Sequence, residues 1–143
     1  MSRDAAAGAV PDVEDVPPVG RVGIEEEPWI EFVDPEGRLR TPAKVLSAIN
    51  PCILLVEFEP NVHVDPHSHP FDTLYIPLRG EVDFNDPGEP PLRPGQLRWV
   101  KAGHSYGPEV GGPDGAEVLI ISMAGEIAID WTRATLPNGR TSQ

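Results

Sequence analysis

Eighteen prolines, spread along all 143 residues, are the feature that most constrains the fold of this chain. Proline lacks a backbone donor and breaks helices, so few windows remain for an α-helix, the best being residues 43–49. From Pro28 onward, short segments rich in β-branched and aromatic residues alternate with turns rich in proline and glycine. The predicted strands are residues 29–33, 53–58, 73–78, 81–84, 96–100, 117–123 and 126–131. The pattern therefore predicts an all-β sandwich or barrel with little helix.

The length is that of one domain, which we place at residues 28–131. Residues 1–27 are acidic and rich in proline, without a periodic apolar pattern, and are predicted to form a disordered tail. Residues 132–143 are predicted to be a second tail, because they are too polar to form core structure. Cys52 cannot form an internal disulfide, and its apolar neighbours predict a buried side chain.

The charge of the chain excludes several classes of partner. A net charge of −12, with a pI near 4.6, leaves no basic stripe for nucleic acid and disfavours an anionic membrane surface. The apolar runs are too short to cross a bilayer. The chain opens without the basic and apolar regions of a secretory signal, so we expect a cytoplasmic protein. With nucleic acid and membranes disfavoured, the expected partner is a small molecule.

The segment around His67 and His69 carries the clearest chemical signal. In a β-strand, side chains two residues apart point to the same face, so two imidazoles in an H-x-H pair can converge on one cation. Histidine is a common ligand of divalent transition metals. The pair therefore predicts a metal site.

The same segment resembles the first motif of the cupin superfamily. That motif is a glycine, five residues, H-x-H, a glutamate and a closing glycine, and the corresponding positions here are Asn61, His67, His69, Thr73 and Gly80. The second cupin motif would fall at residues 95–110, where the fixed positions are occupied by Gly95, Lys101, Gly103, Tyr106 and Val110. The resemblance covers about residues 50–125, with its two motifs at 61–80 and 95–110. It implies a cupin-type double-stranded β-helix, a jelly-roll-like barrel that often forms homodimers.

Two of the four metal ligands of that family are replaced in this chain. Thr73 stands where the glutamate would be, and a neutral hydroxyl is a poor ligand. Tyr106 stands at the third histidine, where its phenol could bind iron, act as a general acid or base, or line the pocket. His104 shares the parity of Tyr106, and a turn at 102–103 could bring it to the site as the third ligand. Asp72 would reach the site only through a β-bulge.

Several further residues are candidates for the surroundings of the site. Asp65 could hydrogen-bond a ligating imidazole, and Tyr75 shares the inward face with Thr73. Arg98 and Trp99 must face opposite ways, and burial preference favours Trp99 inside, although an inward Arg98 could pair with a substrate carboxylate. Glu109 is expected on the rim of the barrel.

Two functions are compatible with these residues. The first is a metal-dependent enzyme, of dioxygenase, isomerase, decarboxylase or lyase type, which holds Fe, Mn, Ni or Zn through His67, His69 and His104 and uses Tyr106 in catalysis. The alternative is a metal-free cupin that binds or senses a small ligand. Fold-level analogy does not choose between them.

Overall fold

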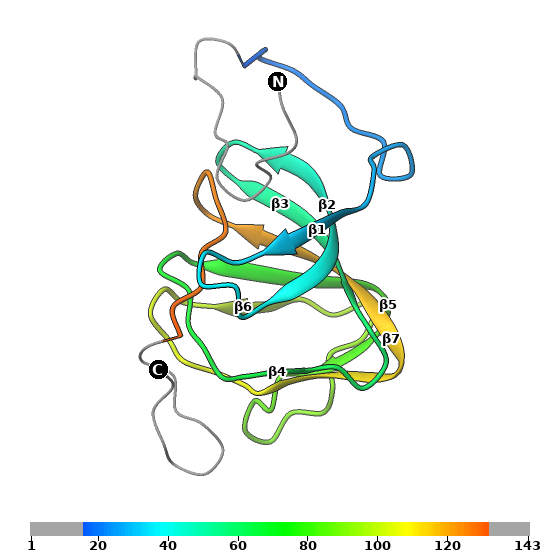
Figure 1. Ribbon diagram of the computed structural model, residues 1–143, viewed down its shortest axis with the longest axis vertical. Coiled ribbons are helices and arrows are strands. Elements are labelled where there is room, and N and C mark those ends of the chain that lie inside the picture. Colours follow the sequence, from blue (N-terminus) through cyan, green and yellow to red (C-terminus); the bar gives the residue numbers. More distant parts are fainter. Residues whose placement is uncertain (1–15, 132–143) are drawn as a thin grey trace.

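The computed structural model of the protein describes residues 16–131, which form strands, bridges and turns and contain no helix (Figure 1). No segment of this part of the chain is a helix long and apolar enough to span a membrane. The strands are β1 (Ile30–Val33), β2 (Arg40–Ala48), β3 (Cys52–Phe58), β4 (His63–Val64), β5 (Thr73–Asp83), β6 (Arg98–Val100) and β7 (Glu109–Ser122). The prediction of an all-β fold is confirmed.

All strand pairs are antiparallel, and they follow the order β1-β2-β3-β7-β5-β6, with β4 attached to the beginning of β7. The long strand β7 organises the sheet. Its second half, residues 116–122, pairs with β3 on one side and with β5 on the other. Its first residues pair with β4 and with the end of β5. The sheet therefore curls around an interior to which most of its strands contribute.

The pairing of β5 with β7 is irregular between Gly80 and Val82, and Gly80 allows the two strands to come close there. Its φ of +71° is in the left-handed region that glycine adopts readily. A Cβ at this position would overlap the carbonyl oxygen of Gly115 and lie 2.8 Å from the Cα of Ala116. The two strands can approach this closely only because residue 80 has no side chain.

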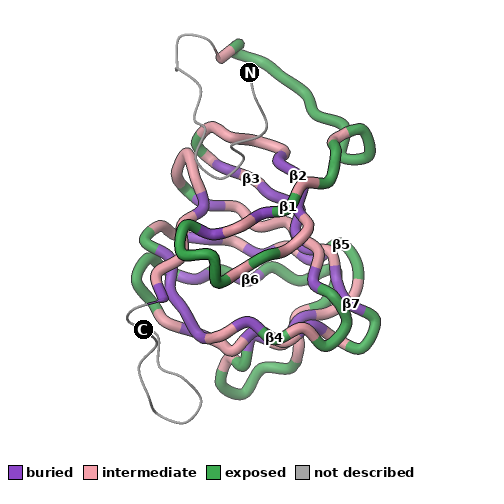
Figure 2. The backbone as a smooth tube through the Cα atoms, in the orientation of Figure 1, coloured by how far each residue is buried: buried purple, intermediate pink, exposed green. Residues whose placement is uncertain are grey.

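Alternation along the strands separates the interior from the outer face (Figure 2). On β3, Leu54, Val56 and Phe58 are buried, and on β5 the same holds for Thr73 and Tyr75. Cys52 is also buried, as the sequence predicts. These residues and their partners on β2 and β7 form one continuous apolar core, into which the candidate site is built.

The N-terminal region leaves the body of the protein as an extended arm (Figures 1 and 2). Residues 16–27 contain turns but no strand or helix, and nearly all of them are exposed. Lys44 holds the arm to β2, because its Nζ donates to the carbonyl oxygen of Ile24 at 2.8 Å and lies 4.9 Å from the centre of the Trp29 ring. Residues 1–15 and 132–143, which include the predicted C-terminal tail, lie outside the described residues.

Two of the secondary-structure predictions are wrong. The best helical window, residues 43–49, is not a helix. All but its last residue belong to strand β2, since Ala43 and Val45 face the core with the period of a strand and pair with β3. Residues 126–131 do not form a strand. Apart from a single bridge between Asp130 and Ser68, packing rather than a β-ladder fixes this segment, with Ile127 and Trp131 buried.

A buried carboxylate ties the end of this segment to the turn after β1. Asp34 accepts hydrogen bonds from the Nε1 of Trp131 at 2.8 Å, the backbone N of Leu39 at 2.6 Å and the backbone N of Glu36 at 3.3 Å. Burial raises the pKa of Asp34, but these donors together lower it more, so that the net pKa is below the ordinary value.

We expect the variant Asp34→Asn to lower the free energy of unfolding by about 1–3 kcal/mol at neutral pH, because its amide would face one of these donors. Since the pKa is depressed in the folded state, the stabilisation by Asp34 is present above the unfolded value of about 4 and is lost as the pH falls through the folded value. Urea titrations between pH 3 and 7 measure this. If the variant lost stability as steeply as the wild type when the pH falls, Asp34 would not be the source of this pH dependence.

Candidate active site

His67 and His69 lie between β4 and β5, in a segment held on both sides by bridges. The backbone of His67 pairs with that of Tyr106, and the residue between the histidines, Ser68, pairs with Asp130. Both imidazoles consequently point into the interior, where His67 is 2% exposed and His69 is 6% exposed. Their ring centres are 5.1 Å apart.

Backbone carbonyl groups orient the two imidazoles. The Nδ1 of His67 lies 2.7 Å from the carbonyl oxygen of Asp65, and that of His69 lies 2.6 Å from the carbonyl oxygen of Ala128. A carbonyl only accepts, so each Nδ1 carries a proton and each Nε2 points inward. Burial, with a smaller contribution from the charge of His67, lowers the pKa of His69 to about 4. His69 is therefore neutral near pH 7, with a free lone pair on Nε2.

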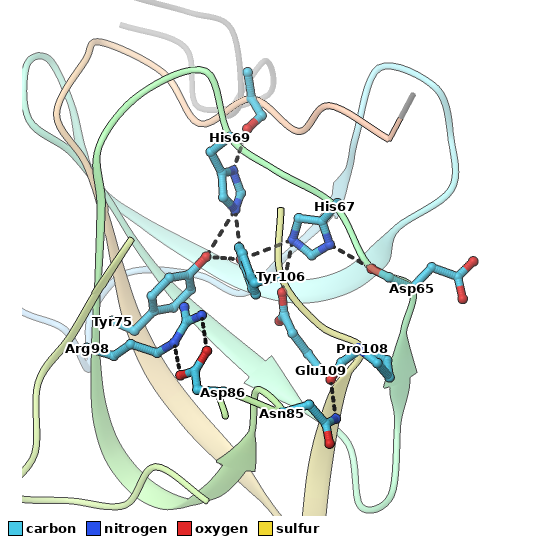
Figure 3. Close-up of polar contacts among 11 residues, drawn as sticks. Asp65, His67, His69, Tyr75, Asn85, Asp86, Arg98, Tyr106, Pro108 and Glu109 are labelled. Carbon is cyan, nitrogen blue, oxygen red and sulfur yellow. Dashed lines mark hydrogen bonds and ion pairs between the residues drawn. The ribbon is translucent and has the colours of Figure 1, made fainter. Parts of the chain in front are cut away.

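Two tyrosine hydroxyls meet these nitrogens (Figure 3). The hydroxyl of Tyr106 lies 3.1 Å from the Nε2 of His67 and 3.0 Å from the Nε2 of His69. The hydroxyl of Tyr75 lies 3.0 Å from the same atom of His69 and also contacts the hydroxyl of Tyr106. Burial above all, together with the charge of Glu109, raises the pKa of both phenols well above the ordinary value. Both tyrosines are neutral hydrogen-bonding groups at this site.

Glu109 is the functional residue that the sequence reasoning missed. It is the first residue of β7, pairs with Val64 of β4 and is 4% exposed rather than on the rim. Its Oε2 lies 2.9 Å from the Nε2 of His67 (Figure 3). A carboxylate after Gly107-Pro108 resembles an ordinary turn residue, so the sequence held no signal for its burial.

Glu109 and His67 form a buried ion pair. Burial lowers the pKa of His67, but the charge and hydrogen bond of Glu109 raise it more, and the net pKa is above the ordinary value. Burial raises the pKa of Glu109, but the same interaction with His67 lowers it further, and the net pKa is below the ordinary value. The Nε2–H of the imidazolium therefore donates to the carboxylate.

The structure reverses the predicted orientation of Arg98 and Trp99. Trp99 is 67% exposed on the outer face, whereas Arg98 is 9% exposed and turns inward. Asp86 compensates the burial of the guanidinium, because it accepts from Nε at 2.7 Å and from Nη2 at 2.9 Å. The guanidinium carbon also lies 4.3 Å from the ring centre of Tyr106 and 4.2 Å from that of Phe84. Arg98 thus supports the site from behind the aromatic rings.

Three other predicted residues lie apart from the histidines. His104 is exposed in a turn, where its backbone N donates to the carbonyl oxygen of Lys101, so it does not join His67 and His69. Asp72 does not reach the site through a bulge, because its carboxylate binds the Nζ of Lys101 at 2.9 Å and the backbone N of Ala102 at 2.9 Å. The carboxylate of Asp65 pairs with Arg38, and this residue meets His67 through its carbonyl group instead.

Thr73 is buried at the position predicted for it, but its hydroxyl is occupied locally. Its Oγ1 donates to the carbonyl oxygen of Phe71 at 2.9 Å. The hydroxyl that meets His69 belongs to Tyr75, two residues further along the same face of β5.

A cavity of about 120 Å³ borders this polar cluster. His67, His69, Tyr75 and Glu109 line it, whereas Tyr106 does not, although its hydroxyl contacts the Nε2 atoms of both histidines. Most of the remaining wall is apolar, formed by Phe32, Leu39, Leu54, Val56, Phe58, Val62, Val64, Ile120, Ile127 and Ile129. The cavity therefore combines an apolar wall with one compact group of acid and base side chains.

The residues present do not fit a divalent metal as they are arranged. Among residues 16–131, no three His, Cys, Asp or Glu side chains come together in a way that could hold a metal ion. The point toward which both Nε2 atoms are directed is occupied by the hydroxyl of Tyr106, and a neutral phenol is a poor ligand.

The fold and the site define a small β-barrel protein with a buried polar cluster in its interior. Comparison with known proteins shows which fold this barrel has. No protein-family model and no curated protein matches the chain. Solved structures do match. KdgF from Halomonas sp. is 20% identical, with a TM-score of 0.56 over 73% of this chain and 94% of that one. The polyketide cyclase RemF from Streptomyces resistomycificus is 21% identical, with a TM-score of 0.62 over 78% of this chain and 84% of that one.

A third similar structure is an RmlC-like cupin protein from Ralstonia eutropha JMP134, which is 13% identical, with a TM-score of 0.56 over 73% of this chain and 68% of that one. At these identities the likeness concerns the fold alone. The chain has the cupin fold, so the predicted cupin-type fold is confirmed.

Proposed function

We propose that the protein is an enzyme that moves a proton on a small organic molecule held in the cavity, with Glu109 as the acid–base residue. The observation that carries this proposal is the buried pair of Glu109 and His67, 2.9 Å apart, on the wall of an otherwise apolar cavity. Ionisable groups with perturbed pKa values in a secluded cleft are a feature of functional sites.

In this proposal the carboxylate of Glu109 takes a proton from the carbon next to a carbonyl group. The electron pair of the broken C–H bond moves onto the carbonyl oxygen, which accepts a hydrogen bond from the hydroxyl of Tyr75 on the cavity wall. Return of the proton to another carbon gives isomerisation, and loss of a group from the adjacent carbon gives a lyase reaction. Tyr106 and Arg98 position the groups that line the cavity. The polyketide cyclase RemF, an enzyme with this fold, supports such a role without specifying the reaction.

A direct test is the exchange of α-protons for deuterium in D₂O, followed by NMR, with cyclohexanone and a panel of similarly small ketones and keto acids. We expect the protein to accelerate exchange of at least one ketone in the panel. Binding without any exchange would instead favour the metal-free module that binds or senses a ligand.

A metal-dependent enzyme of dioxygenase, decarboxylase or related type, with Fe, Mn, Ni or Zn, is the second candidate. The observation in its favour is that the Nδ1 atoms of His67 and His69 are tied to carbonyl groups while their Nε2 atoms point toward one position. Glu109 contacts His67, but among residues 16–131 no three side chains of the usual ligand types are arranged so that they could hold a metal ion.

Elemental analysis of untagged protein separates the two candidates. Under the acid–base proposal we expect well below one equivalent of transition metal, and removal of metal by a chelator should leave α-proton exchange unchanged. About one equivalent of bound metal, lost in the variant His69→Ala together with activity, would favour the second candidate and contradict the first.

The predicted homodimer and the cytoplasmic location remain predictions. In favour of a homodimer, the outward side chains on three adjacent strands are apolar where solvent would favour polar ones: Leu74 and Ile76 on β5, Trp99 on β6 and Ile121 on β7. Sedimentation equilibrium measures the oligomeric state.

A further inference from the structure

We infer that the cavity selects small, uncharged, single-ring compounds that carry one carbonyl group, and that it rejects carboxylates of the same shape. The inference rests on the proposed function, because it names the substrate class of the same site. It follows from the size of the cavity, from the distribution of polar groups on its wall and from the sign of the charges around it.

The size of the cavity suits one ring. Its volume is about 120 Å³, and an engineered apolar cavity of about 150 Å³ in another protein binds benzene. Ile120 of β7 lies between two other residues of the cavity wall. It pairs with Leu54 of β3 on one side and with Tyr75 of β5 on the other. All three side chains line the cavity, so a ligand bound there contacts apolar groups and the polar cluster together.

The polar groups of the wall form two separate sets. His67, His69, Tyr75 and Glu109 are buried and contact one another directly or through Tyr106, which makes one end of the cavity polar. Arg40, Thr41, Glu57 and Glu59 are exposed or half-buried, so they lie where the cavity meets solvent. A ligand with one polar group can place that group against the buried cluster and leave its ring against the apolar wall.

The charges of the wall disfavour an anion. Glu57, Glu59 and Glu109 contribute carboxylates, against a single guanidinium on Arg40, which already pairs with Glu31. Arg98 does not line the cavity. Asp86 binds its Nε and Nη2, and its Nη1, which has no hydrogen-bond partner among the described residues, is buried on the far side of the tyrosine that does line the cavity, where the guanidinium packs on the Tyr75 ring. The imidazolium of His67 is neutralised by Glu109. A buried carboxylate on the ligand would thus meet repulsion, and the described residues that line the cavity offer it no unpaired cation.

Benzamide and benzoate are a matched pair for the test, because they have nearly the same shape and differ in charge at pH 7. We expect benzamide to bind with a dissociation constant at least ten-fold lower than that of benzoate, measured by NMR titration. The variant Glu109→Gln, which removes a carboxylate but keeps the shape, should narrow this ratio by strengthening the binding of benzoate.

The location of the binding site is tested with substitutions that fill the cavity. Ile120→Phe should weaken benzamide binding at least ten-fold, whereas Leu97→Ala, a change at an exposed residue outside the cavity, should leave it unchanged. Ile129→Phe, on another part of the wall, serves as the second variant if Ile120→Phe does not fold by circular dichroism. Benzoate binding as tightly as benzamide, binding unaffected by the filled cavity, or no saturable binding of either compound would overturn the inference.

These outcomes differ from a failure of the proposed function. If benzamide binds in the cavity but no ketone exchanges its α-protons, the catalytic proposal fails while the selectivity for neutral rings stands. If benzoate wins while ketones exchange normally, the inference fails and the proposed function stands.

Discussion

Replacing Gly80 with alanine should lower the free energy of unfolding by about 3 kcal/mol or more, because left-handed strain and a steric overlap act at the same residue. The φ of +71° disfavours any residue with a side chain. The added Cβ would also overlap the carbonyl oxygen of Gly115, which is backbone and cannot move aside without separating β5 from β7. Urea unfolding followed by circular dichroism measures the loss.

Gly88→Ala is the matched control for this prediction. Gly88 has nearly the same φ, +76°, but no heavy atom lies within 4 Å of a Cβ added there. We expect this variant to lose only about 1 kcal/mol, which is the strain alone. Equal effects of the two substitutions would mean that the close approach of β5 to β7 does not limit residue 80.

The all-β fold could be predicted because its signals are local. Prolines suppress helix wherever they fall, and the short run of β-branched, apolar and aromatic residues at 53–58 favours a strand without knowledge of its partners. The same reasoning failed at residues 126–131, which have strand-forming side chains but no neighbouring strand with which to form a ladder. Residues with high strand propensity form a strand only where the tertiary fold supplies a neighbouring strand.

The candidate site could be predicted only in part, and for a similar reason. The direction of His67 and His69 follows from their spacing, whereas the direction of Arg98 depends on Asp86, twelve residues earlier, which makes burial of a guanidinium tolerable. Glu109 becomes part of the site only because β7 begins beside β4. Contacts of this kind depend on the three-dimensional arrangement and leave no trace in residue spacing.

The variant Glu109→Gln should lower the rate of α-proton exchange by about 10²–10⁴-fold, the usual contribution of a general base. The amide has the shape of the carboxylate but cannot accept the proton, and it leaves His67 without its ion-pair partner. Affinity for benzamide should change by less than about threefold, since benzamide binding requires no proton transfer. NMR exchange rates and titrations on the same protein preparation give both quantities.

Glu57→Gln provides the control, because Glu57 also lines the cavity but is only half-buried, where the cavity meets solvent. It removes the same charge without touching the buried pair, and the exchange rate should stay within about twofold of the wild-type rate. If both variants slow exchange equally, the effect comes from the overall charge of the cavity and Glu109 is not the base. If neither slows exchange while His69→Ala abolishes it together with bound metal, the catalytic group is a metal held by the histidines. Only a selective loss in Glu109→Gln, with benzamide binding preserved, agrees with proton transfer by this carboxylate.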